Sequence, residues 1–400
     1  MTTIPPSDAE RQDAIADASQ QGAPQQARAA GRRGDEDGPA VERPRHRVLR
    51  VVATALAALL ALYLVGGTAA AFAIKGRSFA RVATVGVATT YGTYDDWRAQ
   101  AGERSQVEFE SGANELTGWV YGAGNDLGLV VLVHAFGSCA DRYLDVIAWF
   151  VQHGWRVLAY NGSGVEPSGG DSRQSLVQTV ADLRSALAFV ADDPDLKTLP
   201  LALWGHSQGG YAVTAALAFP EAERVRAAVS VSGFNNPSSI ALDVIHDELG
   251  WPAYAVRPFT YLADWPDLAP DAPTAVKGIN ATSAAVLLVQ GTADQLVDPK
   301  RYATTHFAGS IKNKAVAVIK WDVPKQRGHS TLLYSLAALK YRDQAAAADF
   351  ETCLKRAKQP ASQTAGAACQ AKTGYDPLKA NQLNADLFDQ MEDFLDAGVG

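Results

Sequence analysis

Short apolar runs separated by polar segments recur from residue 127 to residue 321, and this pattern predicts strands that alternate with helices. The runs have the length of buried strands, and the intervening stretches at 176–190 and 211–217 carry apolar residues at helical spacing. The strand-like runs are 127–133, 155–160, 199–204, 225–231, 284–290 and 315–321. Such alternation favours a mostly parallel sheet with helices on both faces.

Two further patterns complete the predicted domain. Residues 106–110 and 116–121 alternate polar and apolar positions around Gly112-Ala113-Asn114, which is typical of an antiparallel hairpin. At the other end, Leu387, Met391, Phe394 and Leu395 share one face of a helix over 384–395, which we expect to pack on the sheet.

A longer apolar segment precedes the hairpin. Residues 51–74 contain no charged side chain, and as a helix they would extend about 36 Å, enough to cross a bilayer. Arginines at 43, 45, 47 and 50 precede the segment, whereas Lys75, Arg77 and Arg81 follow it. Basic residues are thus slightly more numerous before the segment than after it. This small excess favours a cytoplasmic N-terminus and an exported C-terminal domain in a single-pass protein of the cell membrane. A cleaved signal peptide is the alternative, because 69–71 and 71–73 offer small-residue cleavage sites.

The patterns predict four regions. Residues 1–47 lack apolar periodicity and are expected to form a disordered tail. Residues 48–75 form the anchor, 76–104 a linker, and 105–400 one domain with a full core.

Gly205-His206-Ser207-Gln208-Gly209 lies between a strand-like run and a helix-like run. A G-x-S-x-G at such a junction indicates a nucleophile elbow, a sharp turn that lifts a serine hydroxyl clear of the backbone. A serine needs a base and an acid, which follow it in the order acid and then histidine in this type of fold. Asp294 follows the run 284–290, and His329 follows the run 315–321. Asp298 is the competing acid, and His246 and His306 are interpreted as ordinary surface or packing histidines.

An oxyanion forms during acyl transfer, and two backbone N–H groups are expected to bind it. We predict these donors at Gln208, directly after the serine, and at Phe136, in the loop that follows the run 127–133.

From residue 107 to the C-terminus the chain resembles the α/β-hydrolase fold, in particular the group of serine aminopeptidases, monoglyceride lipases and lysophospholipases. The resemblance rests on His134-Ala135-Phe136-Gly137, on Tyr160 to Gly164 with Ser168-Gly169-Gly170, and on the elbow and the loops of Asp294 and His329. The sequence departs from the usual pattern at Ala135, where Gly is common, and at Asn161, where Asp is common.

The interval from about 234 to 280 is rich in Pro and aromatic residues and is interpreted as a lid over the ligand crevice. Its rings are expected to line or cover a pocket for a substrate with apolar bulk, although they could instead form the lid's own core. The predicted substrate-binding residues are Trp251, Tyr254, Phe259, Tyr261 and Trp265.

Composition excludes several classes of protein. The net charge is −7 and no basic stripe is present, which argues against a nucleic-acid partner. No zinc, P-loop or dinucleotide motif occurs, so we expect neither metal nor cofactor. Cys353 and Cys369 flank a polar insertion and could form a disulfide outside the cytoplasm, which would leave Cys139 unpaired.

These observations predict a membrane-anchored serine hydrolase that cleaves a small-molecule or lipid-like ester, or an amide, through an acyl-enzyme on Ser207. A peptidase or an acyltransferase of the same fold would use the same residues. A catalytically inactive, membrane-anchored binding protein is the alternative from another class, because a fold does not prove a function.

Overall fold

The computed structural model describes residues 44–358 and 360–400, without the side chains of residues 44, 45, 243–245 and 247–249. The predicted tail over 1–47, with Arg43, therefore lies outside the described residues except for its last four positions. The chain divides into two compact units, Met1–Ala58 and Leu59–Gly400. Helix α1 (Pro44–Ser78) begins with a proline, which is well tolerated at the first helical position because its missing N–H would have no partner there.

Helix α1 is long and apolar enough to span a membrane. Its stretch His46–Ser78 has a mean hydropathy of 2.3 in its most apolar window, and the side chains of that window are exposed. The helix continues past Ile74, where the predicted apolar segment ends. All the contacts of α1 described below are made by its residues after Ala58.

Within the described residues, eight strands form one sheet in the order β1-β2-β4-β3-β5-β6-β7-β8. β1 and β2 form the predicted antiparallel hairpin, β2 also pairs antiparallel with β4, and the remaining pairs are parallel. The strands are β1 (Arg104–Ser111), β2 (Asn114–Tyr121), β3 (Gly128–Val133), β4 (Trp155–Tyr160), β5 (Leu201–His206), β6 (Val225–Val231), β7 (Ala285–Gly291) and β8 (Val316–Trp321). The predicted mostly parallel sheet is confirmed.

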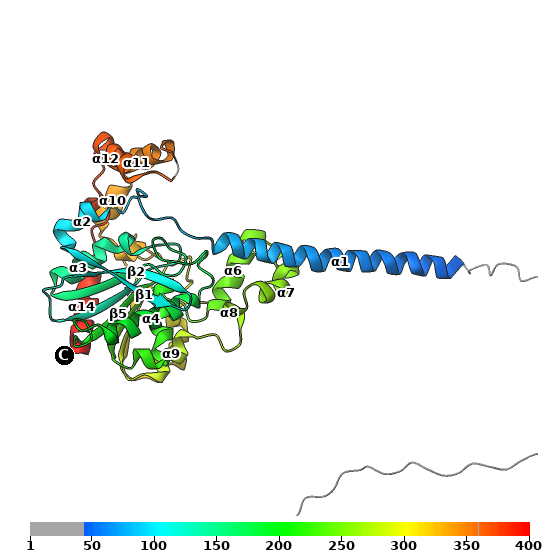
Figure 1. Ribbon diagram of the computed structural model, residues 1–400, viewed down its shortest axis with the longest axis horizontal. Helices are drawn as coiled ribbons and strands as arrows, with labels where there is room; N and C mark the ends of the chain where they lie inside the picture. Colours follow the sequence, from blue (N-terminus) through cyan, green and yellow to red (C-terminus); the bar gives the residue numbers. More distant parts are fainter. Residues whose placement is uncertain (1–43, 359) are drawn as a thin grey trace, which may run out of the picture. The chain divides into compact units, whose positions relative to one another are not determined.

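Helices cover both faces of the sheet (Figure 1). Successive side chains of a strand point to opposite faces of the sheet. Every residue of β3 is buried, so the sheet is covered on both faces at this strand. Leu129 and Val131 pack with residues of α4, α5 and α9 in one core cluster. Val130 and Leu132 pack with residues of α3 and α14 in the other.

The helices fall into groups along the chain. Those before and around the sheet are α2 (Tyr94–Ala101), α3 (Leu144–Gln152), α4 (Gln178–Asp192) and α5 (Gln208–Ala215). The predicted lid interval contains α6 (Pro237–Leu249), α7 (Ala253–Ala263), α8 (Trp265–Leu268) and α9 (Ala275–Ala281). The last group is α10 (Leu336–Arg342), α11 (Ala345–Arg356), α12 (Gln363–Thr373), α13 (Pro377–Ala380) and α14 (Ala385–Val399).

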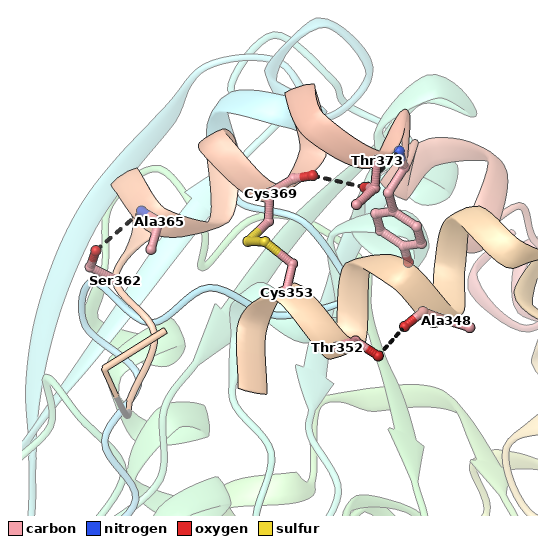
Figure 2. Close-up of a disulfide and its surroundings, with 8 residues drawn as sticks. Ala348, Thr352, Cys353, Ser362, Ala365, Cys369 and Thr373 are labelled. Atoms are coloured by element: carbon pink, nitrogen blue, oxygen red, sulfur yellow. Dashed lines mark hydrogen bonds between the residues drawn. A yellow bond between two sulfur atoms is a disulfide. The ribbon is translucent and has the colours of Figure 1, made fainter. Parts of the chain in front are cut away.

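A disulfide joins the two helices of the polar insertion. Cys353 of α11 and Cys369 of α12 form this bond with their Cα atoms 5.8 Å apart, and Figure 2 shows the two helices side by side. The stacked rings of Phe350 and Tyr375 lie in the same small core. The third cysteine, Cys139, is buried and free.

Candidate active site

Ser207 occupies the sharp turn that the sequence pattern predicts. β5 ends at His206, α5 begins at Gln208, and Ser207 between them has φ 58° and ψ −115°. This left-handed conformation is costly for a residue with a side chain and is typical of functional sites. The backbone N–H of Ser207 donates to the carbonyl oxygen of Val231 at 2.8 Å, which fixes the turn at the carboxyl end of the neighbouring strand β6.

Asp294 and His329 meet in the loops after β7 and β8. The Nδ1 atom of His329 lies 2.8 Å from Oδ2 of Asp294, whose side chain is fully buried. Asp298, the competing acid in the sequence, has a different partner, because its Oδ1 accepts the N–H of Lys300 at 2.7 Å. The carboxylate in contact with His329 is therefore Asp294.

The charged form of Asp294 has several donors. Its Oδ2 accepts from Nε2 of Gln290 at 2.9 Å, and its Oδ1 accepts the N–H groups of Leu296 and Val297. Burial alone would raise the pKa of Asp294, but the hydrogen bond and charge of His329, together with the Val297 and Gln290 donors, hold that pKa below its usual value. Asp294 is thus suited to orient the His329 ring and to stabilise a positive charge on it.

His206, which precedes the serine, supports the same site and was not identified from the sequence. Its Nε2 lies 3.0 Å from the carbonyl oxygen of His329, and its Nδ1 lies 2.9 Å from the Tyr143 hydroxyl. Because a carbonyl can only accept, Nε2 carries the proton and Nδ1 accepts from the Tyr143 hydroxyl. Burial, with a smaller effect from His329, lowers the pKa of His206 to about 3.

This buried neutral histidine predicts a loss of stability in mild acid. An unfolded histidine has a pKa of about 6.5, so below that pH the unfolded chain binds a proton that folded His206 does not. Its contribution to stability is complete above about pH 6.5 and is lost as the pH falls towards 3. Asp145 and Asp267 act in the opposite sense, because burial raises their pKa values to about 7 and the folded chain then binds protons that the unfolded chain does not. We therefore expect the effect of His206 on the melting temperature of the detergent-solubilised protein between pH 7 and pH 5 to be seen by comparison with a variant.

The matched variant is His206→Gln, which keeps polar atoms but cannot take up a proton. It should lose less of its melting temperature than the parent protein over the same interval, because only the parent chain takes up this proton on unfolding. The buried carboxyls of Asp145 and Asp267, whose pKa values burial raises to about 7, titrate alike in both proteins and cancel in the comparison. Equal losses in both proteins would show that His206 makes no contribution.

The two predicted oxyanion donors belong to residues at the cavity of the serine. Phe136 and Gln208 both line the same cavity as Ser207, and neither backbone N–H has a hydrogen-bond acceptor among residues 44–358 and 360–400. The loop of Phe136 is held by its neighbours, since the N–H of Ala135 donates to the Tyr143 hydroxyl and Nε2 of His134 accepts the N–H of Gly162. The loop is therefore fixed at both the Ala135 amide and the His134 ring.

Arg173 joins the loop of Phe136 to the end of α1. Its guanidinium lies 4.0 Å from the centre of the Phe136 ring, and its side chain donates to the carbonyl oxygens of Ser78 and Ala80. The ring of Phe79 contacts that of Phe136 edge to face, with the ring centres 5.4 Å apart. The position of the Phe136 loop thus depends on residues at the end of the apolar helix.

Ser207 and His329 line one cavity of about 640 Å³. Its wall includes Ala71, Ile74, Lys75, Ser78 and Phe79 from the end of α1 and from the residue that follows it. Lys75 pairs with Asp264 of the lid interval at 2.9 Å. The last turns of α1 therefore belong to the site, and the buried side chain of Ala71 shows that they pack on protein.

The five predicted lid aromatics do not line this cavity. Phe259 is buried, but against α1, where its ring lies 5.0 Å from that of Tyr63. Trp251, Tyr254, Tyr261 and Trp265 are exposed instead. The lid lines the cavity with Ile240, Ala241, Thr260, Ala263 and Asp264. The physical reason is that α7 packs against α1, a contact between distant segments that directs its rings away from the serine.

The remaining sequence interpretations concern histidines and metals. His246 and His306 are exposed, and neither lines the cavity. In the described part of the chain, no group of three or more His, Cys, Asp or Glu side chains is arranged to hold a metal ion.

Comparison with known proteins finds a family that matches part of the chain and two curated relatives. Residues 124–255 match the family of serine aminopeptidases S33, a stretch that includes Ser207 but ends before Asp294 and His329. The polyketide transferase grgF of a Penicillium species is 32% identical over 133 residues, which are 32% of this chain and 45% of that protein. The polyketide transferase af380 of Aspergillus fumigatus is 32% identical over 137 residues, or 33% of this chain and 46% of that protein. The chain thus spans about half the length of the curated relatives it matches.

Solved structures are similar at lower identity. The esterase Pf2001 of Pyrococcus furiosus has 19% identity and a TM-score of 0.46, with 63% of this chain and 90% of that chain covered. The α/β hydrolase GrgF of Penicillium has 18% identity and a TM-score of 0.47, with 74% and 99% covered. The family match and the order of strands and helices support an α/β hydrolase of the serine hydrolase group, as the sequence predicts.

Proposed function

We propose that the protein is a membrane-anchored serine hydrolase that cleaves a carboxylic ester through an acyl-enzyme on Ser207. The observation that carries the proposal is the Asp294–His329 hydrogen bond of 2.8 Å, made beside the cavity that both His329 and Ser207 line. A nucleophile in a sharp turn, a histidine and an acid that orients it are the components of serine-dependent acyl transfer.

The proposed mechanism assigns each group one role. The Ser207 hydroxyl attacks the ester carbonyl, and its proton passes to Nε2 of His329, because Nδ1 faces Asp294. The N–H groups of Phe136 and Gln208 bind the oxyanion of the tetrahedral intermediate. His329 then protonates the leaving alcohol, and a water molecule activated by the same histidine releases the acid and restores Ser207.

The cavity favours an apolar acyl group. Aliphatic and aromatic side chains form much of its wall, among them Ile74, Phe79, Leu176, Phe234, Ile240 and Leu333. Its volume of about 640 Å³ is within the range of small-molecule sites. The Lys75–Asp264 pair lies on the side of α1 and α7, where it neutralises two of the charges that line the cavity.

Acyl transfer to an acceptor other than water is the second candidate. It is favoured by the two curated relatives, which are polyketide transferases similar to this chain over about a third of its length. A peptidase would need an amide to be the preferred substrate. The full-length protein should therefore be tested for fluorophosphonate labelling and compared on p-nitrophenyl esters, on aminoacyl and prolyl amides, and on esters with added alcohol acceptors.

Each outcome of this comparison favours one function. Faster turnover of esters without acyl transfer supports the hydrolase, whereas faster turnover of amides supports a peptidase. An excess of transfer product over free acid would identify an acyltransferase. An absence of both labelling and turnover would contradict the proposal and favour a catalytically inactive binding protein.

We also propose that α1 is an uncleaved anchor, that residues 1–47 are a cytoplasmic tail, and that 105–400 form an exported catalytic domain joined to the anchor by 76–104. Two observations support this arrangement. Ala71, at the potential cleavage sites, is 2% exposed and lines the cavity, so cleavage there would remove part of the wall. The Cys353–Cys369 disulfide is also typical of proteins outside the cytoplasm.

Protease treatment of intact cells tests this topology. We expect the catalytic domain to be degraded while the tail and a cytoplasmic marker protein survive, and we expect Cys353 and Cys369 to be oxidised. Release of a soluble form that begins near Phe72 or Ile74 would indicate a cleaved signal peptide. A protected domain with both thiols reduced would place the catalyst in the cytoplasm.

A further inference from the structure

Helices α7 and α8 and the turn before α7 expose an unusual set of large apolar side chains. We call the aromatic face the set formed by Trp251, Tyr254, Tyr261, Leu262 and Trp265, whose exposed fractions range from 38% to 81%. Three of them, Tyr254, Tyr261 and Leu262, belong to α7, where their spacing of seven and eight residues places them on one side of the helix. Between residues 251 and 266 Arg257 is the one exposed charged residue, because Asp264 is buried and paired with Lys75. Exposed apolar surface of this kind usually marks an interaction site.

Helix α7 is fixed against the apolar helix α1. The Tyr63 hydroxyl donates to the carbonyl oxygen of Ala255 at 2.9 Å, and the Tyr63 ring contacts Phe259 edge to face. The ring of Phe259 also covers Gly67, where a Cβ atom would lie 2.3 Å from Cε2 of that ring. Glycine at this position allows the close approach of α7 to α1. The residues of the aromatic face that belong to α7 therefore lie on a helix that packs against α1.

The length of α1 indicates where its contact with α7 lies relative to a lipid bilayer. α1 has 35 residues, and about 20 helical residues suffice to cross a hydrocarbon core of about 30 Å. Its last turns, from Ala71 onward, line the cavity and pack on protein. A span of about 20 residues that begins at Val51, after Arg50, ends at Ala70. Gly67 and Tyr63 lie within about 11 Å of that end, so α7 contacts α1 next to this boundary of the membrane. Trp and Tyr side chains are enriched at that boundary because their rings are apolar and their polar atoms contact water and headgroups.

We propose that the aromatic face inserts into the headgroup region of the lipid bilayer beside α1. The proposal rests on the proposed function, in that α1 is taken as the anchor. The same two helices supply Ala71, Ile74, Thr260 and Ala263 to the cavity wall, so the site lies next to the membrane surface. Esters dissolved in the bilayer reach Ser207 along this wall, which makes membrane-partitioned acyl esters the preferred substrate class.

A fluorescent label on the aromatic face tests the contact. Tyr254→Cys introduces an exposed thiol into a chain whose other cysteines are buried or paired. The full-length protein, labelled there with NBD, is reconstituted in phosphatidylcholine vesicles with and without headgroup-region spin-labelled lipid. The control is Lys379→Cys on α13, whose parent side chain is 70% exposed and lies outside the aromatic face.

We expect the label at position 254 to shift its emission to shorter wavelength and to be quenched at least twofold more than the label at position 379. Equal quenching at the two positions would overturn the proposal. The result does not depend on catalysis, so it separates failure of this contact from failure of the proposed function.

A kinetic test uses the triple variant Trp251→Ser, Leu262→Ser and Trp265→Ser, in which none of the changed residues lines the cavity. Hydrolysis of a long-chain ester embedded in vesicles should fall about tenfold, while hydrolysis of water-soluble p-nitrophenyl acetate stays unchanged. Unchanged turnover of the embedded ester would contradict the proposed route of the substrate. Two results would instead contradict the proposed function. One is a parent protein that does not hydrolyse p-nitrophenyl acetate, and the other is a parent protein that alkaline carbonate extracts from membranes.

Discussion

Ser207→Ala is expected to abolish fluorophosphonate labelling and to lower ester hydrolysis by roughly four to six orders of magnitude. The reason is local, because the turn between β5 and α5 presents this hydroxyl to the cavity that also contains His329. Without it, water has to attack the ester directly, with the oxyanion donors as the main remaining catalytic groups. Gel-based labelling of the full-length protein and a continuous p-nitrophenyl ester assay measure the two effects.

Two matched controls make this expectation specific. Ser105→Ala removes an exposed hydroxyl from β1 and should change neither labelling nor turnover. His329→Ala should lower turnover nearly as much as the serine variant, whereas His306→Ala, at an exposed position, should have almost no effect. Labelling that persists in Ser207→Ala would assign the nucleophile to another serine.

The sequence predicted the elements that depend on local patterns. The parallel strands, the hairpin and the turn at Ser207 each follow from a run of residues that is close together in the chain. The choice of Asp294 over Asp298 also relied on a local argument, because a side chain near the strand end is held more firmly than one farther along the loop. The contact of Asp294 with His329 agrees with that argument.

Features that depend on distant contacts could not be predicted. The aromatic residues of the lid were identified by type, but whether their rings point to the cavity or to solvent depends on the packing of α7 against α1. The contribution of the end of α1 to the cavity wall could not be predicted for the same reason, because Ala71 and Phe79 are far in sequence from Ser207. The hydrophobic pattern of residues 51–74 predicts an anchor, but it carries no information on these contacts.

The hydrogen-bond partners of the site were also missed. His206 is the variable position of the G-x-S-x-G motif, and only the fold brings it to Tyr143 and to the backbone of His329. Gln290, at the end of β7, could have been noticed as a polar residue in an otherwise apolar strand. A buried amide at a strand end needs a partner, and Asp294 follows four residues later.

The second large effect is expected from Gly209→Ala. Gly209 is in the first turn of α5, and a Cβ atom there would lie 2.0 Å from the carbonyl oxygen of Val133 and 2.7 Å from its carbonyl carbon. Alanine is the better helix former by about 1 kcal/mol, but the atoms that obstruct it belong to the backbone of a buried central strand. The start of α5 would have to move away from β3, and such overpacking typically costs about 1–3 kcal/mol or more.

The same displacement would move the two groups that the proposed chemistry needs. Ser207 and Gln208 directly precede Gly209, so a shift of α5 changes the position of the nucleophile and of one oxyanion donor. We therefore expect the melting temperature of the detergent-solubilised protein to fall by at least roughly 5 °C, with a large loss of kcat for ester hydrolysis. Gly124→Ala is the matched control, because no atom lies within 4 Å of its added Cβ. If Gly209→Ala were as stable and active as Gly124→Ala, the close contact between α5 and β3 would be absent, and the tight turn that positions Ser207 would lose its physical basis.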